Sequence, residues 1–143
     1  MSGWRPPKGG KNGGCLCGAV RFECRSIYDV IYCHCSKCCH WSGAPAVLSA
    51  NVPGGDFSLI KGTPEAYRSS EQGLRHFCSA CGTHLYFIND GPFVSINVLA
   101  LNDSEDVRPR LHQCVASKLE WFTITDDLPQ YPDSRIPAPG REP

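Results

Sequence analysis

Short segments in which apolar and polar residues alternate recur along the first hundred residues. They are "AVRFEC" (residues 19–24), "DVIYCH" (29–34), "FSLI" (57–60), "HLYFI" (84–88) and "FVSINV" (93–98). Alternation with period two is typical of strands, and the intervening "PGG", "KGTP" and "NDGP" are turn sequences. The pattern predicts an all-β sandwich or folded sheet, with a single helical turn around residues 36–41.

The chain has 143 residues, which suits one domain with its own core. Its two ends are poor in apolar residues and rich in Gly, Lys or Pro. We therefore expect a flexible N-terminal tail over residues 1–10, a folded domain over 11–130 and a Pro-rich C-terminal tail over 131–143.

Charge and hydropathy exclude several classes of partner. The 14 Lys and Arg balance the 14 Asp and Glu, so no overall field favours nucleic acid or anionic lipid. No apolar run is long enough for a signal sequence or a membrane span. We expect a cytoplasmic protein with a small-molecule partner, and in a reducing compartment its ten cysteines favour metal over disulfides.

Two of the three cysteine clusters form half-sites for one metal ion. "CLCG" contains Cys15 and Cys17, and "CSACG" contains Cys78 and Cys81. A C-x-C pair on extended backbone points both sulfurs to one face, and a C-x-x-C pair turns back on itself. The glycine after each pair can adopt positive φ where the chain turns. Together the four predict a structural tetrahedral zinc that contributes on the order of 10 kcal/mol to folding.

The third cluster, "CHCSKCC", leaves Cys33, Cys35 and Cys38 for a second zinc. Three protein ligands and an open position are typical of a catalytic zinc. The alternative is a fourth protein ligand from Cys39, His34 or His40. Three thiolates lower the acidity of bound water, so a soft thiol substrate suits an open position better than a hydrolytic water.

Other polar residues are candidates for the site. Cys39 is either a reactive thiol or a buried one, and Arg75 with Lys37 either holds a substrate carboxylate or is a solvated charge. His84 and His112 either orient a substrate or ligand or are structural. Cys24 and Cys114 are interpreted as core thiols. No general base is evident, so the catalytic candidates are Cys39, His40 and Arg75.

The ordered motifs C-x-C-G, C-H-C-x-x-C and R-x-F-C-x-x-C-G-T, with "HQCVASKLEWFTITDDLP" near the end, resemble the glutathione-dependent formaldehyde-activating enzyme family, which includes centromere protein V. The resemblance covers about residues 11–130. It implies a mostly β, zinc-stapled tent-like fold with two zinc ions per chain. The structural ion would be held by Cys15, Cys17, Cys78 and Cys81, and the catalytic ion by Cys33, Cys35 and Cys38.

The family resemblance also implies an activity, the joining of formaldehyde to glutathione to give S-(hydroxymethyl)glutathione, a carbon-sulfur lyase reaction in reverse. The leading hypothesis is thus a zinc-dependent lyase acting on a thiol adduct, with glutathione as a candidate thiol. The alternative is a non-enzymatic zinc scaffold that binds a protein partner. Neither the oligomeric state nor the physiological substrate follows from the sequence.

Overall fold

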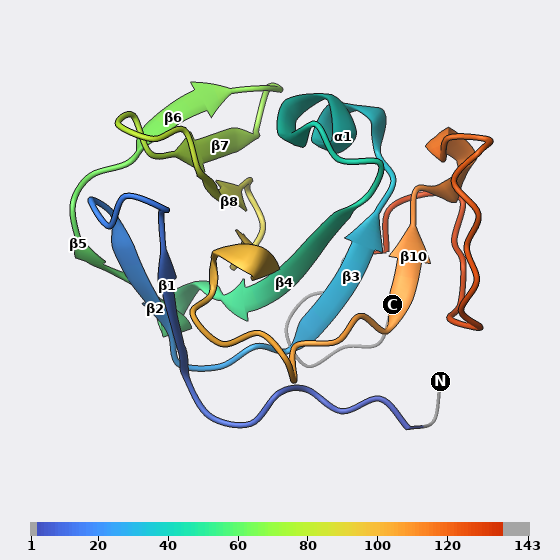
Figure 1. Cartoon of the computed structure of the whole chain (residues 1–143), viewed down its shortest axis with the longest axis horizontal. Coiled ribbons are helices and arrows are strands. Elements are labelled where there is room, and N and C mark those ends of the chain that lie inside the picture. The colour runs from blue at the N-terminus through green and yellow to red at the C-terminus, as the bar shows by residue number, and fades with distance from the viewer. Residues whose placement is uncertain (1–2, 136–143) are drawn as a thin grey trace.

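The computed structural model describes residues 3–135 and contains two β-sheets (Figure 1). The smaller sheet has the order β1-β2-β5 and the larger the order β10-β3-β4-β9-β8-β7-β6. The strands are β1 (Lys11–Gly14), β2 (Arg21–Cys24), β3 (Asp29–Cys33), β4 (Val47–Pro53), β5 (Phe57–Lys61), β6 (Glu65–Arg68), β7 (Leu74–Phe77), β8 (His84–Ile88), β9 (Phe93–Asn97) and β10 (Leu111–Gln113). The helix is α1 (Ser36–Ser42), and short 3-10 turns cover Gly54–Asp56, Val98–Ala100 and Val115–Ser117. The prediction of a mainly β fold with few helical turns is confirmed.

The five segments with clear alternation all became strands, and the predicted helical turn is α1, whereas β1, β4, β6, β7 and β10 were not predicted. Strand β1 was missed because "KNGG" has the composition of a linker. Only glycine fits at two of its positions, because the backbone of other segments comes very close. A Cβ on Gly13 would lie 2.4 Å from the carbonyl oxygen of Ala100, and a Cβ on Gly14 would lie 2.2 Å from the carbonyl oxygen of Val20. Strand β10 was missed because it has only three residues and pairs in parallel with β3.

The larger sheet buries one face against the smaller sheet. Alternate residues of its strands, among them Val52, Leu85 and Ile96, join Phe22 of β2 in the core. The rings of Phe22 and Phe57, both from the small sheet, pack at 5.5 Å, and Phe57 packs against Tyr86 of the large sheet at 4.7 Å. Apolar burial between the sheets therefore supplies the main packing energy of the fold.

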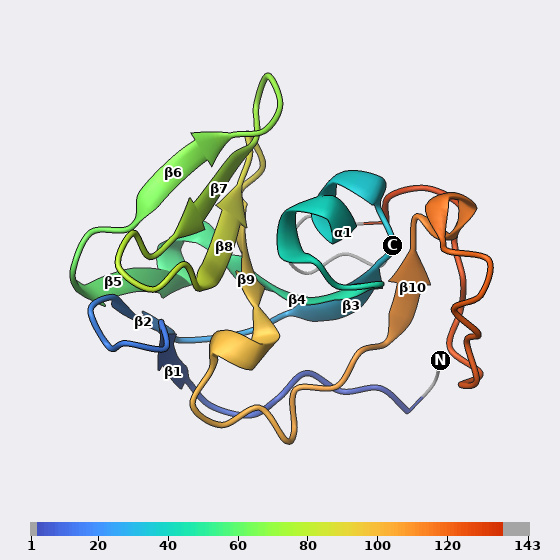
Figure 2. The same ribbon diagram turned by 45° about the horizontal axis from the view of Figure 1, so that its top comes forward.

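The opposite face of the larger sheet is covered in part by α1. The sheet is bent, so that β6, β7 and β8 form one arm, β3, β4 and β10 form the other, and α1 lies in the angle (Figure 2). Trp41 attaches the helix to the first arm: its ring stacks on Tyr67 at 6.1 Å and on His84 at 4.7 Å, and meets Phe77 edge-on at 5.7 Å. This contact places the third cysteine cluster between the arms.

The described parts of both predicted tails make specific contacts with the domain. The indole of Trp4 donates a hydrogen bond to the carbonyl oxygen of Arg108 at 2.8 Å. After residue 130, Tyr131 N–H bonds the carbonyl of His112 at 2.9 Å, and Arg135 N–H bonds the side chain of Gln113 at 2.8 Å. Residues 1–2 and 136–143 of those tails lie outside the described part. Within residues 3–135, no helix is long and apolar enough to cross a membrane.

Candidate metal centres and the cavity between them

The first cysteine set meets where the two sheets are joined at their ends. Cys15 and Cys17 lie in the loop from β1 to β2, and Cys78 and Cys81 in the loop from β7 to β8. Their four sulfurs all lie within 4.8 Å of one another, so the group can hold a metal ion. One such ion would connect the small sheet to the large one.

The two loops have similar backbone hydrogen bonds. Cys15 N–H bonds the carbonyl of Val20 and Cys78 N–H that of Thr83, each at 3.0 Å and each closing a six-residue turn. Gly18 and Gly82 have φ of 83° and 79° inside these turns, in the left-handed region predicted for them. A direct link also joins the loops, since Leu16 N–H donates to the Thr83 hydroxyl at 3.0 Å.

The sulfur separations fit tetrahedral zinc. Cys15 Sγ lies 3.6 Å from Cys17 Sγ, which lies 3.8 Å from Cys78 Sγ. A ZnS₄ tetrahedron with bonds of about 2.3 Å has edges of about 3.8 Å. The Thr83 hydroxyl, 3.2 Å from Cys81 Sγ, lowers the pKa of Cys81 to about 5. A sulfur that ionises readily is the form in which cysteine binds metal.

The second cysteine set is gathered only in part. Cys33, at the end of β3, and Cys38, in α1, have their sulfurs 3.8 Å apart, again the edge of a thiolate tetrahedron. Within residues 3–135, the first set is the only group of three or more metal-ligating side chains whose ligand atoms all lie within 4.8 Å, so Cys35 does not complete a second one. The hydrogen bond between Cys33 and Cys38 lowers the pKa of Cys33 and raises that of Cys38.

Arg75 contacts this pair directly. The guanidinium nitrogens of this buried residue of β7 lie 3.7 and 3.8 Å from Cys38 Sγ, its Nε donates to the Ser69 hydroxyl at 2.9 Å, and its charge lies over the Phe87 ring. The positive charge favours a thiolate at Cys38, against the burial and the Cys33 bond that raise its pKa. The sequence left Arg75 as either a ligand of a substrate carboxylate or a solvated charge, whereas in the structure it is buried and its polar partners are Ser69 and Cys38.

A cavity of about 840 Å³ opens between the two arms of the sheet and α1. Its lining includes Cys33, Cys35 and Cys38, together with residues of the sheet face opposite the core, such as Ser95 and Asn97. Its volume is in the range that holds a drug-sized ligand. None of the four cysteines of the first set lines it. The two cysteine sets therefore differ in setting: one lies at a sheet junction, with Cys17 exposed, and the other lies at the wall of a cavity.

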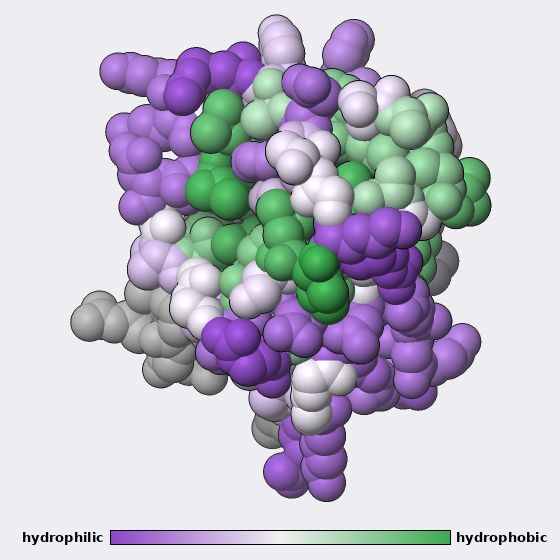
Figure 3. All heavy atoms as spheres, turned by 90° about the vertical axis from the view of Figure 1, so that its left-hand side faces the viewer, coloured by the Kyte–Doolittle hydropathy of each residue, from purple (hydrophilic) through white to green (hydrophobic). Residues whose placement is uncertain are grey.

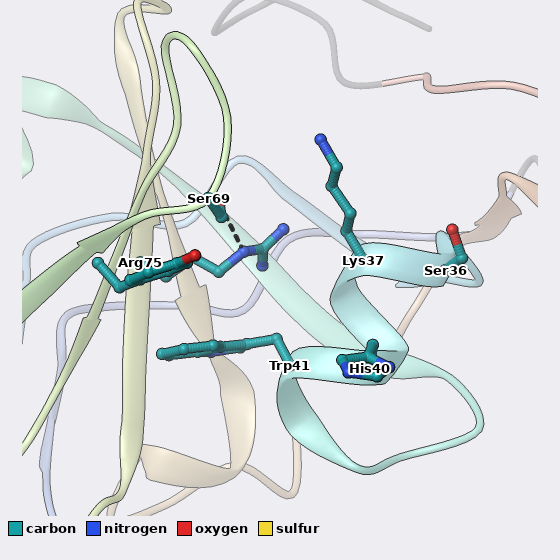
Figure 4. A pocket seen from close by; sticks show the side chains of 7 residues that line it. Ser36, Lys37, His40, Trp41, Ser69 and Arg75 are labelled. Carbon is teal, nitrogen blue, oxygen red and sulfur yellow. Dashed lines mark hydrogen bonds between the residues drawn. The ribbon is translucent and has the colours of Figure 1, made fainter.

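A smaller cavity of about 380 Å³ lies beside the first, between α1 and β7. Figure 4 shows the Arg75 guanidinium directed towards α1, with the Trp41 ring beneath it in this view and Lys37 and His40 on the helix. Lys37 and His40 are exposed. The arrangement combines an aromatic wall with two cationic side chains, a surface suited to an anionic ligand.

Buried histidines lie behind Cys33 and Cys35. His34 Nε2 is 2.9 Å from His112 Nδ1, and His112 Nε2 is 3.0 Å from a carboxylate oxygen of Asp126. With Asp126 ionised, the network assigns the Nε2 hydrogen of each histidine as the donor along this chain. His112 also stacks on Tyr32 at 4.9 Å. These contacts hold the backbone at His34, between the two cysteines, which is a positioning role. From the sequence alone, this role of His34 could not be distinguished from that of a fourth metal ligand.

The remaining candidates have distinct surroundings. Cys39 is half-buried, its thiol donates to the carbonyl of Pro45 at 3.4 Å, and burial raises its pKa. Cys24 is buried in the core, as expected. Cys114, interpreted as a core thiol, is only half-buried and lines the larger cavity. Sequence reasoning missed this position because the parallel pairing that aligns Gln113 with Cys33 leaves no local pattern.

Comparison with known proteins identifies relatives over most of the chain. Residues 11–117 match the profile of the family described as glutathione-dependent formaldehyde-activating enzyme. A curated protein of Halomonas elongata, named "Putative glutathione-dependent formaldehyde-activating enzyme", is 30% identical over 142 residues, covering 87% of this chain and 90% of its own. These matches include all seven predicted zinc-binding cysteines.

The fold is also similar to that of a solved structure. A crystal structure of a Rhodobacter sphaeroides protein superposes with a TM-score of 0.55 at 20% identity, covering 84% of this chain and 98% of that one. At this identity the similarity concerns the fold alone.

Proposed function

Because this chain belongs to the glutathione-dependent formaldehyde-activating enzyme family, we propose that it is a zinc enzyme that forms or cleaves a carbon-sulfur bond in a thiol adduct of formaldehyde, with glutathione as the thiol. The observation that carries the proposal is the different setting of the two cysteine sets. The first is at a sheet junction outside the cavity, whereas Cys33, Cys35 and Cys38 line the cavity of about 840 Å³. A scaffold that needed two structural ions would have no reason to expose one of them to a ligand-sized space.

The proposal includes two zinc ions per chain. Cys15, Cys17, Cys78 and Cys81 would hold a structural ion, and Cys33, Cys35 and Cys38 the catalytic one. Bound there, zinc would supply a soft Lewis-acid position that favours a thiolate over water. The sulfur separations of 3.6 to 3.8 Å support sulfur coordination at both sets.

The side chains around the second set have separate roles in this proposal. Arg75 balances the negative charge of the thiolates through Cys38, and so keeps the cavity able to accept a further anionic sulfur. Lys37, exposed on the same side of α1, is the cation free to meet a carboxylate of glutathione. Trp41 and the sheet face supply the apolar wall that excludes water from the reacting sulfur.

The chemical step is an addition. In the forward direction the glutathione sulfur uses a lone pair to form a bond to the formaldehyde carbon, and the carbon-oxygen π-bond breaks towards oxygen. The proton lost by the thiol ends on that oxygen, which becomes the hydroxyl of S-(hydroxymethyl)glutathione. Nothing is oxidised or reduced, so no redox cofactor is required.

Exchange NMR with ¹³C-formaldehyde tests the function, because the uncatalysed reaction already reaches equilibrium and only the rate can reveal an enzyme. The two-zinc protein is expected to accelerate interconversion of free formaldehyde and the adduct, and Cys35→Ser is expected to return the rate to the uncatalysed value. Cys39→Ser is the matched control, a cysteine outside both predicted sets. An uncatalysed rate with fully zinc-loaded wild-type protein would refute the function.

A zinc scaffold that binds a protein partner is the second candidate function. It is favoured by an exposed apolar surface at the edge strand β5. Leu59 and Ile60 of the edge strand β5 are 42% and 57% exposed. Figure 3 shows apolar side chains gathered in the middle of the face at this side of the molecule, surrounded by polar ones. Failure of the exchange experiment with folded, two-zinc protein would leave this as the better account.

A further inference from the structure

A fourth thiol lies at the wall of the larger cavity, supplied by a distant part of the chain. Cys114 follows β10, and β10 pairs in parallel with β3 so that Gln113 is opposite Cys33. Cys114 lines the same cavity as Cys33, Cys35 and Cys38. Four cysteines therefore line one cavity, although only three are close together in the sequence and, among the described residues, no three of these four sulfurs all lie within 4.8 Å of one another.

The backbone holds Cys114 in an unusual conformation. Its φ of 59° makes it the one non-glycine residue among residues 3–135 with positive φ. The conformation is fixed by neighbours on both sides: Cys114 N–H bonds the carbonyl of Asp133 at 3.0 Å, and Ser117 N–H bonds the carbonyl of Cys114 at 3.0 Å. L-residues rarely adopt this region because it is sterically strained, and such strain concentrates at functional sites.

The backbone places Cys114 next to the segment that contains the other cysteines. His34, which lies between Cys33 and Cys35, donates its N–H to the carbonyl oxygen of Gln113 at 3.0 Å. Cys114 directly follows Gln113, so the pairing of the two segments holds it at the same cavity wall.

We infer that Cys114 is the fourth sulfur ligand of the metal held by Cys33, Cys35 and Cys38 in the resting protein, and that a thiol substrate displaces it. The inference rests on the proposed function and adds a residue that the family match, which ends at residue 117, does not assign. In the exchange, the bond from the metal to the Cys114 sulfur breaks as the bond to the incoming sulfur forms. The proton of the incoming thiol passes to Cys114, and no atom changes oxidation state.

The other candidates for this position are less suited. The Cys39 thiol is directed to the carbonyl of Pro45. His40 is exposed and lines the smaller cavity, not the larger one. His34 uses Nε2 with His112, and although its Nδ1 has no hydrogen-bond partner among the described residues, the side chain is buried and does not line the larger cavity. Cys114 alone among them lines the cavity together with all three cysteines.

A resting fourth ligand has a measurable consequence for substrate affinity. The apparent dissociation constant of a thiol rises by the inverse of the fraction of protein in which the position is open. If the closed form predominates by about ten to one, Cys114→Ser should bind glutathione about tenfold more tightly than wild type. A thiol that only packs in the cavity wall would give no such gain.

The direct test is ¹¹³Cd NMR of the full chain loaded with two cadmium ions in thiol-free buffer. Cadmium resonances distinguish four-sulfur from three-sulfur coordination, and the ion at Cys15, Cys17, Cys78 and Cys81 serves as an internal four-sulfur standard. In wild type both resonances are expected in the four-sulfur range. Cys114→Ser should move one of them to the three-sulfur range, and Cys39→Ser should move neither.

The possible outcomes distinguish failure of the proposed role of Cys114 from failure of the proposed enzyme function. Two bound ions, one of them already three-sulfur in wild type or unchanged in Cys114→Ser, would overturn the role of Cys114 and leave the proposed enzyme intact. Binding of only one ion, at the first cysteine set, would overturn both. Isothermal titration with glutathione on the zinc form of Cys114→Ser checks the affinity gain, and an unchanged or weaker affinity would contradict displacement.

Discussion

Arg75 illustrates how a single residue can contact a proposed metal ligand instead of a substrate. Both of its terminal nitrogens are directed to Cys38 Sγ, at 3.7 and 3.8 Å, and Nε is directed to Ser69. A guanidinium used in this way affects every thiol substrate equally, since it acts on the site itself. Lys37, exposed on α1 at the smaller cavity, has no such engagement with Cys38 among the described hydrogen bonds.

This contrast gives a prediction with two thiols. Arg75→Gln should lower the exchange rate about tenfold, the effect of 1.4 kcal/mol, with glutathione and with cysteamine, which has no carboxylate. Lys37→Gln should lower the rate with glutathione and leave that with cysteamine unchanged. If Arg75→Gln affected glutathione alone, Arg75 would be a carboxylate ligand, as the sequence first suggested.

The burial of His76 is expected to make the free energy of unfolding depend on pH. Its ring stacks on Tyr86 at 4.3 Å, and within residues 3–135 its buried Nδ1 has no hydrogen-bond partner. Burial lowers the pKa of His76 below its ordinary value of about 6.5. The unfolded chain therefore takes up a proton that the folded chain resists. The stability from neutral His76 is present above about pH 6.5 and is lost as pH falls towards the folded pKa.

We predict that His76→Phe reduces the loss of stability between pH 7.5 and pH 5.5. Urea unfolding of wild type and variant at both values, in the same zinc-buffered solution, measures the difference and cancels the acid sensitivity of the metal sites. Equal losses in the two proteins would contradict the assigned role of His76.

At the scale of elements, a metal ion in the first cysteine set would connect loops of the two sheets that are far apart in the sequence. Cys17 and Cys78 are 61 positions apart in the sequence, and their loops belong to different sheets. The second set lies largely within one stretch, from the end of β3 into α1. Loss of a long-range connection removes more folding free energy than loss of a local one.

Cys78→Ser should thus destabilise the protein by several kcal/mol, a large part of the ~5–15 kcal/mol total of a typical domain. Cys35→Ser should leave the thermal midpoint within a few degrees of wild type while abolishing exchange activity. Thermal unfolding by circular dichroism compares the two, with Cys39→Ser as reference. Similar midpoints for Cys78→Ser and Cys35→Ser would show that the division into a structural and a catalytic site is wrong.

Elements that the sequence identified share a local cause. Strands β2, β3, β5, β8 and β9 were predicted from the apolar and polar residues within each segment, a signal that is visible without knowledge of their neighbours. The cysteine half-sites likewise have local spacing, and the four cysteines that this spacing paired lie together as a group that could hold a metal ion. In contrast, β10 and Cys114 depend on parallel pairing with β3, and Trp41 depends on the arm of the sheet that it meets. Contacts between distant segments leave no periodic signal in one sequence.

On the scale of the whole molecule, the packed core and the larger cavity lie on opposite faces of the larger sheet. One face of the larger sheet packs on the smaller sheet, with the first cysteine set at their junction. The other face, bent around α1, forms the cavity with the second set at its wall (Figure 2). The account therefore predicts two metal ions of which only one is accessible to a ligand.

Native mass spectrometry of the full chain, purified without added metal and mixed with glutathione, tests this claim most directly. It resolves the number of zinc ions and the number of glutathione molecules on each species. We predict a two-zinc protein that binds one glutathione, and a Cys38→Ala variant that retains one zinc and binds none. Glutathione bound equally to one-zinc and two-zinc species, or a wild-type protein with a single zinc, would contradict the account.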